Sequence, residues 1–241
     1  MAILKRYLTD NEQSRLLGAA KGCAGPLALR DYSWMRLLIE TGMRVNELAT
    51  LSLHQAQQAL VCGWLVVDAA QRKGGKRGHE YLVTEPVRQC LGALLRVHEE
   101  LMPMWFLTRE EGVPAGFVPP LLWGRCGEVR VKGAPVLLAE HMSVRSLQAR
   151  MKHWACLAGL HPKVSPHWLR HTRGVNIINR SRGANPLKVV QEALGHASLA
   201  STGIYTQMSR EAYTAELHQV AGGVRMPMRQ ARAFVQQGAG L

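Results

Sequence analysis

His167-Trp168-Leu169-Arg170-His171 is the stretch of sequence on which the interpretation of the whole chain depends. We expect it to open an amphipathic helix after a loop that prolines interrupt. Spacings of three and four then put its three basic side chains on neighbouring positions of one helical face, where they suit a phosphate. Taken alone, the stretch also fits an exposed basic helix end. A zincin-type metal site is disfavoured, because it needs a glutamate directly after the first histidine and Trp168 stands there.

A second basic group stands at a predicted helix junction in the segment TGMRVNEL (41–48). One helix is expected to end near Gly42 and the next to begin near Val45, so Arg44 lies between them. An arginine at a helix start can aim its rigid fork of donors at a phosphate, helped by free backbone N–H groups. On this segment alone, a surface ion pair between Arg44 and Glu47 is the alternative.

The C-terminal part of the chain adds the segments LGH (194–196) and GIY (203–205). The first contains His196 and the second contains Tyr205. A lone tyrosine at helical spacing is usually a half-buried packing residue. Neither segment indicates chemistry by itself.

The charge of the chain favours a polyanionic partner. Thirty lysines and arginines stand against 17 acidic residues, which leaves a net charge of +13. A polyanionic partner is the simplest reason to tolerate such self-repulsion, and DNA, RNA or an anionic membrane surface would each explain it. No apolar run approaches the roughly 20 residues that span a bilayer, and no secretory signal is recognisable. The five cysteines occur singly, which fits a reducing compartment. We therefore expect a soluble, cytoplasmic protein.

Periodicity and turn residues predict a mainly α fold with a small antiparallel β-sheet, of the α+β class. Thr9 and Glu12 form a capping box that opens the first helix. Two β-like runs, 60–67 and 81–84, flank a basic turn and predict a hairpin. The stretch 103–139 is rich in glycine and proline and is expected to hold loops with short strands. The remaining expected helices cover about 34–42, 45–51, 86–101, 143–160, 167–178 and a short segment ending at 195.

In this order, the segments resemble the tyrosine recombinase (phage integrase) family. The family pattern is an arginine in T-G-x-R-x-x-E-L, a lysine in a β-hairpin, then H-x-L-R-H, L-G-H and a nucleophilic tyrosine. The resemblance covers roughly residues 9–213 and implies the fold shared by tyrosine recombinase and type IB topoisomerase catalytic domains. By this resemblance the catalytic residues are Arg44, Lys73, His167, Arg170, His196 and Tyr205.

The resemblance also implies a set of DNA-binding cations. The hairpin turn offers two lysines, and the family usually keeps its catalytic lysine at the first one of a K-G-x-K turn. Lys73 is therefore assigned as catalytic and its neighbour as a DNA contact. The expected DNA-binding residues are Arg72, Lys76, Arg77 and Arg173.

The implied activity is site-specific recombination of double-stranded DNA through a 3′-phosphotyrosyl intermediate at Tyr205, for integration, inversion or resolution. Arginines grip the phosphate in this chemistry, so no metal, ATP or other cofactor is expected. Implied partners are further copies of the chain, as a tetramer on two DNA sites, and an accessory DNA-bending protein; no membrane is expected. The rival interpretations are a catalytically silent DNA-binding regulator on the same scaffold, a type IB topoisomerase and, more distantly, a metallohydrolase.

The expected domain organisation is a catalytic domain over 1–220 and a basic, mobile tail over 221–241. Most family members carry a separate DNA-binding domain of roughly a hundred residues before the segment that here begins at Thr9. Eight residues precede Thr9 in this chain. We therefore expect no N-terminal core-binding domain, as in the short recombinases that invert fimbrial promoters.

Overall fold

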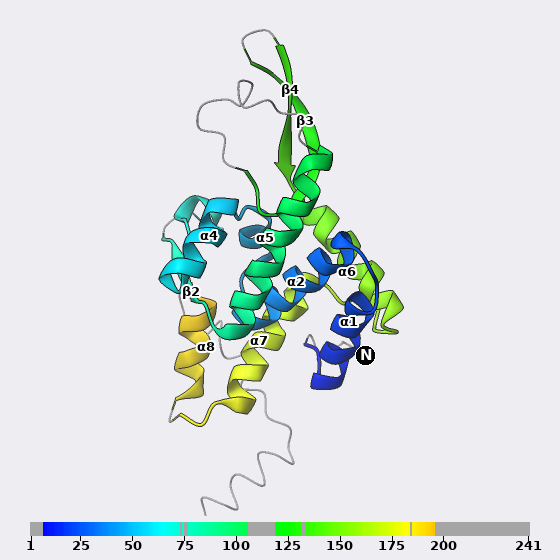
Figure 1. The fold of residues 1–241 in the computed structure, drawn as a ribbon. Helices are drawn as coiled ribbons and strands as arrows, with labels where there is room; N and C mark the ends of the chain where they lie inside the picture. The colour runs from blue at the N-terminus through cyan, green and yellow to red at the C-terminus, as the bar shows by residue number, and fades with distance from the viewer. Residues whose placement is uncertain are drawn as a thin grey trace, which may run out of the picture. The chain divides into compact units, whose positions relative to one another are not determined.

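The computed structural model describes residues 7–72, 74, 77–105, 119–131, 134–183 and 185–195 (Figure 1). All of them belong to the unit formed by residues 1–205. Several predicted features lie outside the described residues: Lys73, Lys76, His196, Tyr205 and the tail 221–241.

The first helix begins where the sequence predicts, and the second ends there but begins at Pro26, earlier than the predicted residue 34. α1 (Asp10–Lys21) opens at Thr9, whose hydroxyl accepts from the backbone N–H of Glu12 at 3.3 Å. The Glu12 carboxylate accepts from the Thr9 backbone N–H at 2.7 Å, so the predicted capping box is confirmed. α2 (Pro26–Thr41) starts with a proline, which needs no backbone N–H in the first turn. It ends at Gly42, whose φ of 70° is readily adopted by glycine.

The helix predicted over 45–51 is slightly shorter in the structure, and a further helix that was not predicted follows it. α3 (Val45–Ala49) is short, and Ser52 then caps a new helix, α4 (Leu53–Cys62). The strand predicted to begin at residue 60 was placed too early. The backbone stays helical until Gly63, which has a φ of 80° and closes α4.

The predicted hairpin with a basic turn is confirmed. β1 (Trp64–Val67) and β2 (His79–Leu82) pair antiparallel along their whole length. Alternate side chains, among them Leu65 and Tyr81, face the core, as the period of a strand requires. Between the strands, a short 3₁₀ helix, η1 (Ala69–Gln71), leads into the basic turn.

The second hairpin is longer than expected. After α5 (Glu85–Trp105), β3 (Trp123–Val131) and β4 (Ala134–His141) pair antiparallel where loops with short strands were predicted over 103–139. Figure 1 shows this hairpin projecting from the helical body. The length of its strands was underestimated because glycines such as Gly124 weaken the β pattern. A Cβ at Gly124 would lie 3.2 Å from the His141 carbonyl oxygen, which explains a glycine there.

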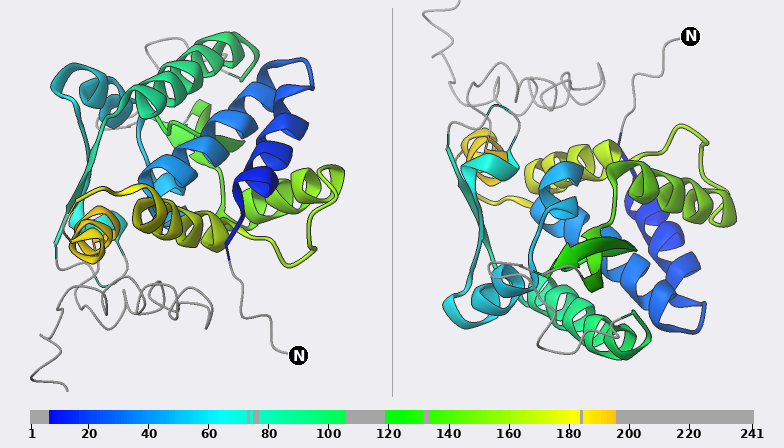
Figure 2. Two further views of the ribbon diagram at one scale, coloured as in Figure 1. Left: turned by 90° about the horizontal axis from the view of Figure 1, so that it is seen from below. Right: turned by 90° about the horizontal axis from the view of Figure 1, so that it is seen from above.

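Three more helices complete the described fold: α6 (Val144–Leu157), α7 (Pro166–Arg180) and α8 (Pro186–Leu194). α2 lies in the centre and packs against α1, α5 and α7 (Figure 2). Its side chains, such as Trp34 and Leu38, are fully buried in the main core. The predicted fold class, mainly α with small antiparallel sheets, is confirmed. None of the described helices combines the length and apolar character needed to cross a membrane.

Candidate functional site

The junction between α2 and α3 forms one part of the candidate site. Arg44 is the N-cap residue of α3, as the sequence predicts, and 35% of its side chain is exposed. Gly42 lies against α7 and α8, because a Cβ there would overlap Leu194 Cδ2 and come within 3.0 Å of Arg173 Cγ. A glycine at this point therefore permits the close approach of three segments.

Glu47, one turn into α3, is a buried carboxylate with donors on both oxygens. Oε1 accepts from Arg44 Nη1 at 3.0 Å and from Arg72 Nε at 3.1 Å. Oε2 accepts from the Arg44 backbone N–H at 2.9 Å and from the Tyr81 hydroxyl at 2.7 Å. Burial alone raises the pKa of Glu47, but these hydrogen bonds outweigh it and hold the pKa below its usual value. Glu47 is therefore a fixed anion beneath Arg44.

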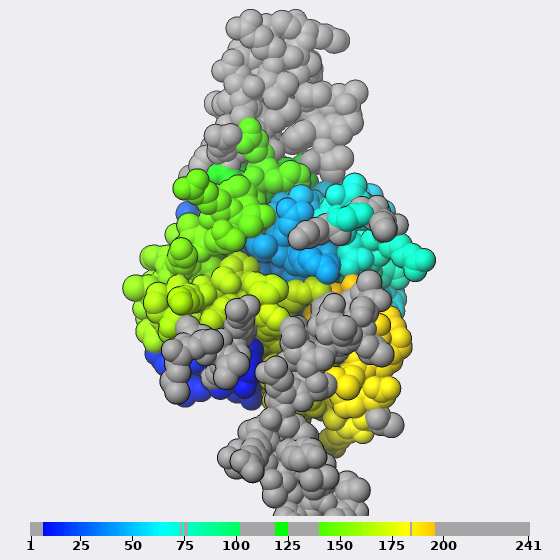
Figure 3. Space-filling view, turned by 180° about the vertical axis from the view of Figure 1, so that it is seen from behind, coloured from blue at the N-terminus to red at the C-terminus, as the bar shows by residue number. Residues whose placement is uncertain are grey.

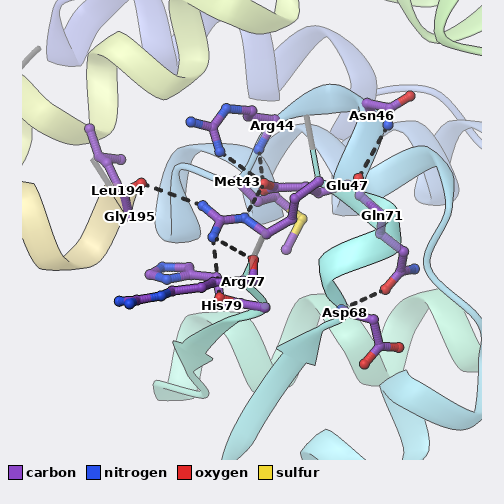
Figure 4. A network of polar contacts seen from close by, with 12 residues as sticks. Met43, Arg44, Asn46, Glu47, Asp68, Gln71, Arg77, His79, Leu194 and Gly195 are labelled. Carbon is purple, nitrogen blue, oxygen red and sulfur yellow. Dashed lines mark hydrogen bonds and ion pairs between the residues drawn. The ribbon is translucent and has the colours of Figure 1, made fainter. Parts of the chain in front are cut away.

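Arg72 connects Glu47 to the hairpin and to the end of α8. Its Nη1 donates to the carbonyl oxygens of Arg77 and Gly78, both at 3.2 Å, and its Nη2 donates to the Gly195 oxygen at 3.4 Å (Figure 4). Only 12% of its side chain is exposed. The expected DNA contact by Arg72 stays a prediction, and the contacts seen here are with the protein itself.

Arg170 lies buried in the N-terminal part of α7 and joins the α2–α3 junction to the end of α8. Its Nη1 donates to the Gly42 carbonyl and its Nη2 to the Leu194 carbonyl, each at 2.6 Å. These bonds tie the α2–α3 junction to the last residue of α8. Figure 3 looks onto the face where the light-blue segment around residue 50, the cyan hairpin and the yellow-green α7 adjoin.

His167 and His171 lie one turn apart on α7. Their Nε2 atoms are 2.8 Å apart and their rings meet edge to face, so one ring donates a hydrogen bond and the other accepts it. The two histidines and Arg170 occupy neighbouring positions, as the spacing predicts. Across the described residues, no group of three or more His, Cys, Asp or Glu side chains could hold a metal ion.

The other expected DNA-binding arginines differ in their surroundings. The Arg77 side chain is exposed at the end of the hairpin turn. Arg173 points to a groove of about 660 Å³ that also includes Glu40 and Trp64, and its Nη1 lies 3.8 Å from Glu40 Oε2. Desolvation lowers the pKa of the Arg173 guanidinium. Among the described residues its buried Nε has no hydrogen-bond partner.

The sequence did not identify the residues that hold the site's arginines and its loop in place. Tyr81 and Gln71 were not singled out, and Glu47 was considered only as a surface partner of Arg44. The side-chain amide of Gln71 donates to the Thr50 carbonyl at 2.6 Å, and the Gln71 backbone carbonyl accepts from the Asn46 side chain at 3.2 Å. Together these bonds fix η1 against α3. The glutamate of the T-G-x-R-x-x-E-L pattern was the available signal for Glu47; no local signal marks the other two.

Of the predicted catalytic set, the described residues include Arg44, His167 and Arg170. Arg170 bonds the carbonyl of Gly42, two residues before Arg44, and His167 lies one turn before Arg170 on α7. The others lie outside the described residues, yet two of them adjoin described ones in sequence. Arg72 precedes Lys73 and Gly195 precedes His196.

Comparison with known proteins extends this site-based interpretation. The model of the family described as "Phage integrase family" matches residues 6–212. Tyrosine recombinase XerD of Pseudomonas aeruginosa is 33% identical over 208 residues, which are 86% of this chain and 59% of the relative. Tyrosine recombinase XerC of Vibrio parahaemolyticus is 32% identical over 205 residues, or 85% of this chain and 55% of the relative. The chain thus spans less than two thirds of these relatives.

Solved structures show the same fold. The crystal structure of XerA recombinase aligns with a TM-score of 0.61 and 22% identity, covering 91% of this chain and 64% of that one. The Tn1549 transposon integrase, in complex with transposon right end DNA, aligns with a TM-score of 0.59 and 18% identity, covering 89% of this chain and 66% of that one. The chain belongs to the phage integrase family, and most of it is the catalytic domain of a tyrosine recombinase.

Proposed function

We propose that this chain is a site-specific recombinase that cleaves and rejoins double-stranded DNA through a covalent bond to Tyr205. The observation that carries the proposal is the pair of Arg170 bonds to the carbonyls of Gly42 and Leu194. Through these bonds, three motif segments that are far apart in sequence meet: the α2–α3 junction, α7 and the end of α8. This meeting point, here called the corner, adjoins Lys73 and His196 in sequence.

The proposed reaction is an in-line exchange at phosphorus. The Tyr205 oxygen forms a bond to the scissile phosphorus while the bond from phosphorus to the 5′ oxygen breaks. His167 assists removal of the tyrosine proton, and Lys73 gives a proton to the departing oxygen. A 5′-hydroxyl from a second strand reverses the exchange, and the covalent bond conserves the energy of the phosphodiester, so ATP is not needed.

Arg44 and Arg170 supply positive charge to the non-bridging oxygens, and His196 donates a hydrogen bond to one of them. Preorganised donors of this kind are usually the largest part of the rate enhancement in phosphoryl transfer.

The partner we propose is duplex DNA, contacted in part by Lys76, Arg77 and Arg173. The chain's net charge of +13 supports this. Similar solved structures include XerH bound to its difH substrate and a lambda integrase dimer bound to a core site. We propose assembly as a tetramer on two sites, with help from a DNA-bending protein, in the cytoplasm at the nucleoid.

The test is capture of a protein–DNA adduct. Wild-type protein is incubated with duplexes that carry a randomised central segment and a nick, so that the short 5′-hydroxyl strand diffuses away and cleavage is trapped. We expect an adduct that survives denaturation and EDTA, and its DNA yields the cleaved site.

Tyr205→Phe should abolish this adduct while leaving DNA binding nearly intact, because only the nucleophilic oxygen is removed. Tyr213→Phe, the matched control, should form the adduct. An adduct that persists in Tyr205→Phe would place the nucleophile elsewhere. Binding without any adduct in wild type would favour a silent DNA-binding regulator.

A further inference from the structure

Glu47 is shared by two arginines, and this sharing sets the charge of the corner. Arg44 Nη1 and Arg72 Nε both donate to the same carboxylate oxygen, Oε1, at 3.0 and 3.1 Å. The other oxygen accepts from the Arg44 backbone and from the Tyr81 hydroxyl, which is neutral. The cluster therefore holds one negative and two positive charges, and one positive charge remains uncompensated.

Arg72 is held in this arrangement from its far side. The carbonyls of Arg77, Gly78 and Gly195 accept from its two terminal nitrogens at 3.2 to 3.4 Å. The Gly195 backbone is close enough that an added Cβ would lie 2.8 Å from Arg72 Nη2. Carbonyl oxygens carry no net charge, so they fix the guanidinium without neutralising it.

Arg44 is placed differently. It stands at the start of α3 with 35% of its side chain exposed, and Glu47 is its ion-pair partner. A buried carboxylate at this distance attracts a cation strongly, because the surroundings screen the charges less than water does. With Arg72 removed, Glu47 would compensate Arg44 alone. The pair formed by Arg44 and Glu47 would then carry no net positive charge, and Arg170 would be left to supply the charge by itself.

We propose that Arg72 is a positioning residue for Arg44: by sharing Glu47, it keeps the charge and the orientation of Arg44 available to the scissile phosphate. This role rests on the proposed recombinase function and adds a residue to it. It differs from a DNA contact by Arg72, because here the arginine acts through Glu47.

The first test compares two substrates with full-length protein. One is the nicked duplex recovered with wild type, and the other carries a neutral methylphosphonate at the scissile position. Arg72→Met should slow cleavage of the phosphate substrate by about tenfold or more, less than the hundredfold or more expected for a lost transition-state donor. On the neutral substrate the difference from wild type should shrink several-fold, because there is little charge left to stabilise.

Arg77→Met is the matched control from the same turn, since its side chain is exposed. It should weaken binding and reduce the slope of log K against log salt by about 0.9, as for one lost phosphate contact. Its rate defect should be equal on the two substrates. Arg72→Met should leave the salt slope unchanged, and Arg72→Lys should recover part of the rate because it restores the charge.

The second test removes the charge of Glu47. If Arg72 acts through Glu47, the double variant Arg72→Met/Glu47→Gln should cleave faster than Arg72→Met, because nothing then compensates Arg44. A double variant as slow as Arg72→Met, or slower, would overturn the proposal and favour a direct phosphate contact. So would an equal loss on both substrates, or wild-type rates in Arg72→Met.

Thermal unfolding identifies variants that fail to fold. If Arg72→Met is among them, Arg72→Gln replaces it in both tests, because it also removes the charge but keeps an amide N–H donor. If the proposed function is wrong, the wild-type protein forms no adduct. If only this inference is wrong, the wild type forms the adduct and the Arg72 variants give one of the contrary results above.

Discussion

Two buried carboxylates, Asp31 and Glu47, have nearly the same chemistry in two regions of the molecule. Asp31 accepts from Arg30 at 2.9 and 3.0 Å, from Arg150 at 2.5 Å and from the indole N–H groups of Trp34 and Trp154 at 3.1 and 2.9 Å. Burial alone raises its pKa, but the charge of Arg30 and hydrogen bonds led by that of Trp154 bring it below its usual value. Each carboxylate thus holds two arginines and at least one aromatic donor.

The two carboxylates differ in the positions that their partner arginines occupy in the fold. Arg150 lies in the middle of α6, with its guanidinium carbon 5.4 Å from the ring centre of Trp154. Its bond to the Asp31 carboxylate ties α6 to α2. Arg44 caps a helix at a junction that Arg170 also contacts through Gly42. Both arginines are 35% exposed, so exposure does not distinguish them. The two clusters therefore differ in the position of their exposed arginines in the fold: Arg150 joins two helices, whereas Arg44 stands beside the junction that Arg170 contacts.

The largest effect on stability should come from Asp31→Asn. Breaking a buried ion pair by removing one partner costs about 3–5 kcal/mol, because charges are left without compensation. We expect urea unfolding to show a loss of about 3 kcal/mol, since Arg150 can turn towards water. The cleavage rate of the folded fraction should not change. A variant that loses cleavage while remaining folded would mean that Asp31 also serves the site.

The next effect is on the reaction, from Arg44→Ala. Losing one transition-state donor should slow cleavage by about a hundredfold or more, or about 2.7 kcal/mol. Arg150→Ala is the matched control, because its exposed fraction is the same and it also binds a buried carboxylate. It should cleave at the wild-type rate on the nicked duplex. Equal rates for the two variants would remove the distinction between the clusters.

Local patterns predicted the parts of the fold that local interactions determine. The Thr9 capping box, the end of α2 at Gly42 and the hairpin around the basic turn were all predicted and confirmed. The patterns failed where tertiary packing decides. α4 keeps residues 60–62 helical despite their β-like composition, and the β3–β4 hairpin forms despite its glycines.

The candidate site shows the same limit. Helical spacing placed His167, Arg170 and His171 together, yet it did not show that Arg170 is buried between two carbonyls. The Glu47 cluster joins residues 47, 72 and 81, and no local pattern contains such long-range contacts. Residues that support a site through such long-range contacts are therefore harder to predict than residues that share one local motif.

A smaller effect is expected from Tyr81→Phe, which removes one donor from Glu47 and no charge. A hydrogen bond to a charged group contributes about 1.5–3 kcal/mol, so we expect a loss near the lower figure. The lowered pKa of Glu47 means that this stability is present above the unfolded pKa and is lost as pH falls through the folded one. The gap between wild type and variant in urea unfolding should thus be full at pH 7 and narrow in acid. A gap that does not narrow would assign the loss to packing, and a cleavage rate changed more than a few-fold would show that Glu47 needs the hydroxyl as well as the two arginines.

The smallest effect should come from Asp10→Asn, which breaks an ion pair as short as those of the buried clusters. Asp10 Oδ1 lies 2.6 Å from Arg180 Nη2, but the two side chains are 78% and 63% exposed. Water solvates both charges whether or not they meet, and ordering two mobile side chains offsets part of the attraction. We expect the free energy of unfolding to change by about 0.5 kcal/mol or less, and the change to vanish when salt is raised to about 1 M, where the screening length is about 3 Å. Asp31→Asn should remain destabilising at that salt concentration, because salt does not enter its buried site. A loss at Asp10 that approached the one at Asp31 would mean that short distance, and not burial, sets the strength of these pairs, and the argument from buried Glu47 to the charge of Arg44 would lose its physical basis.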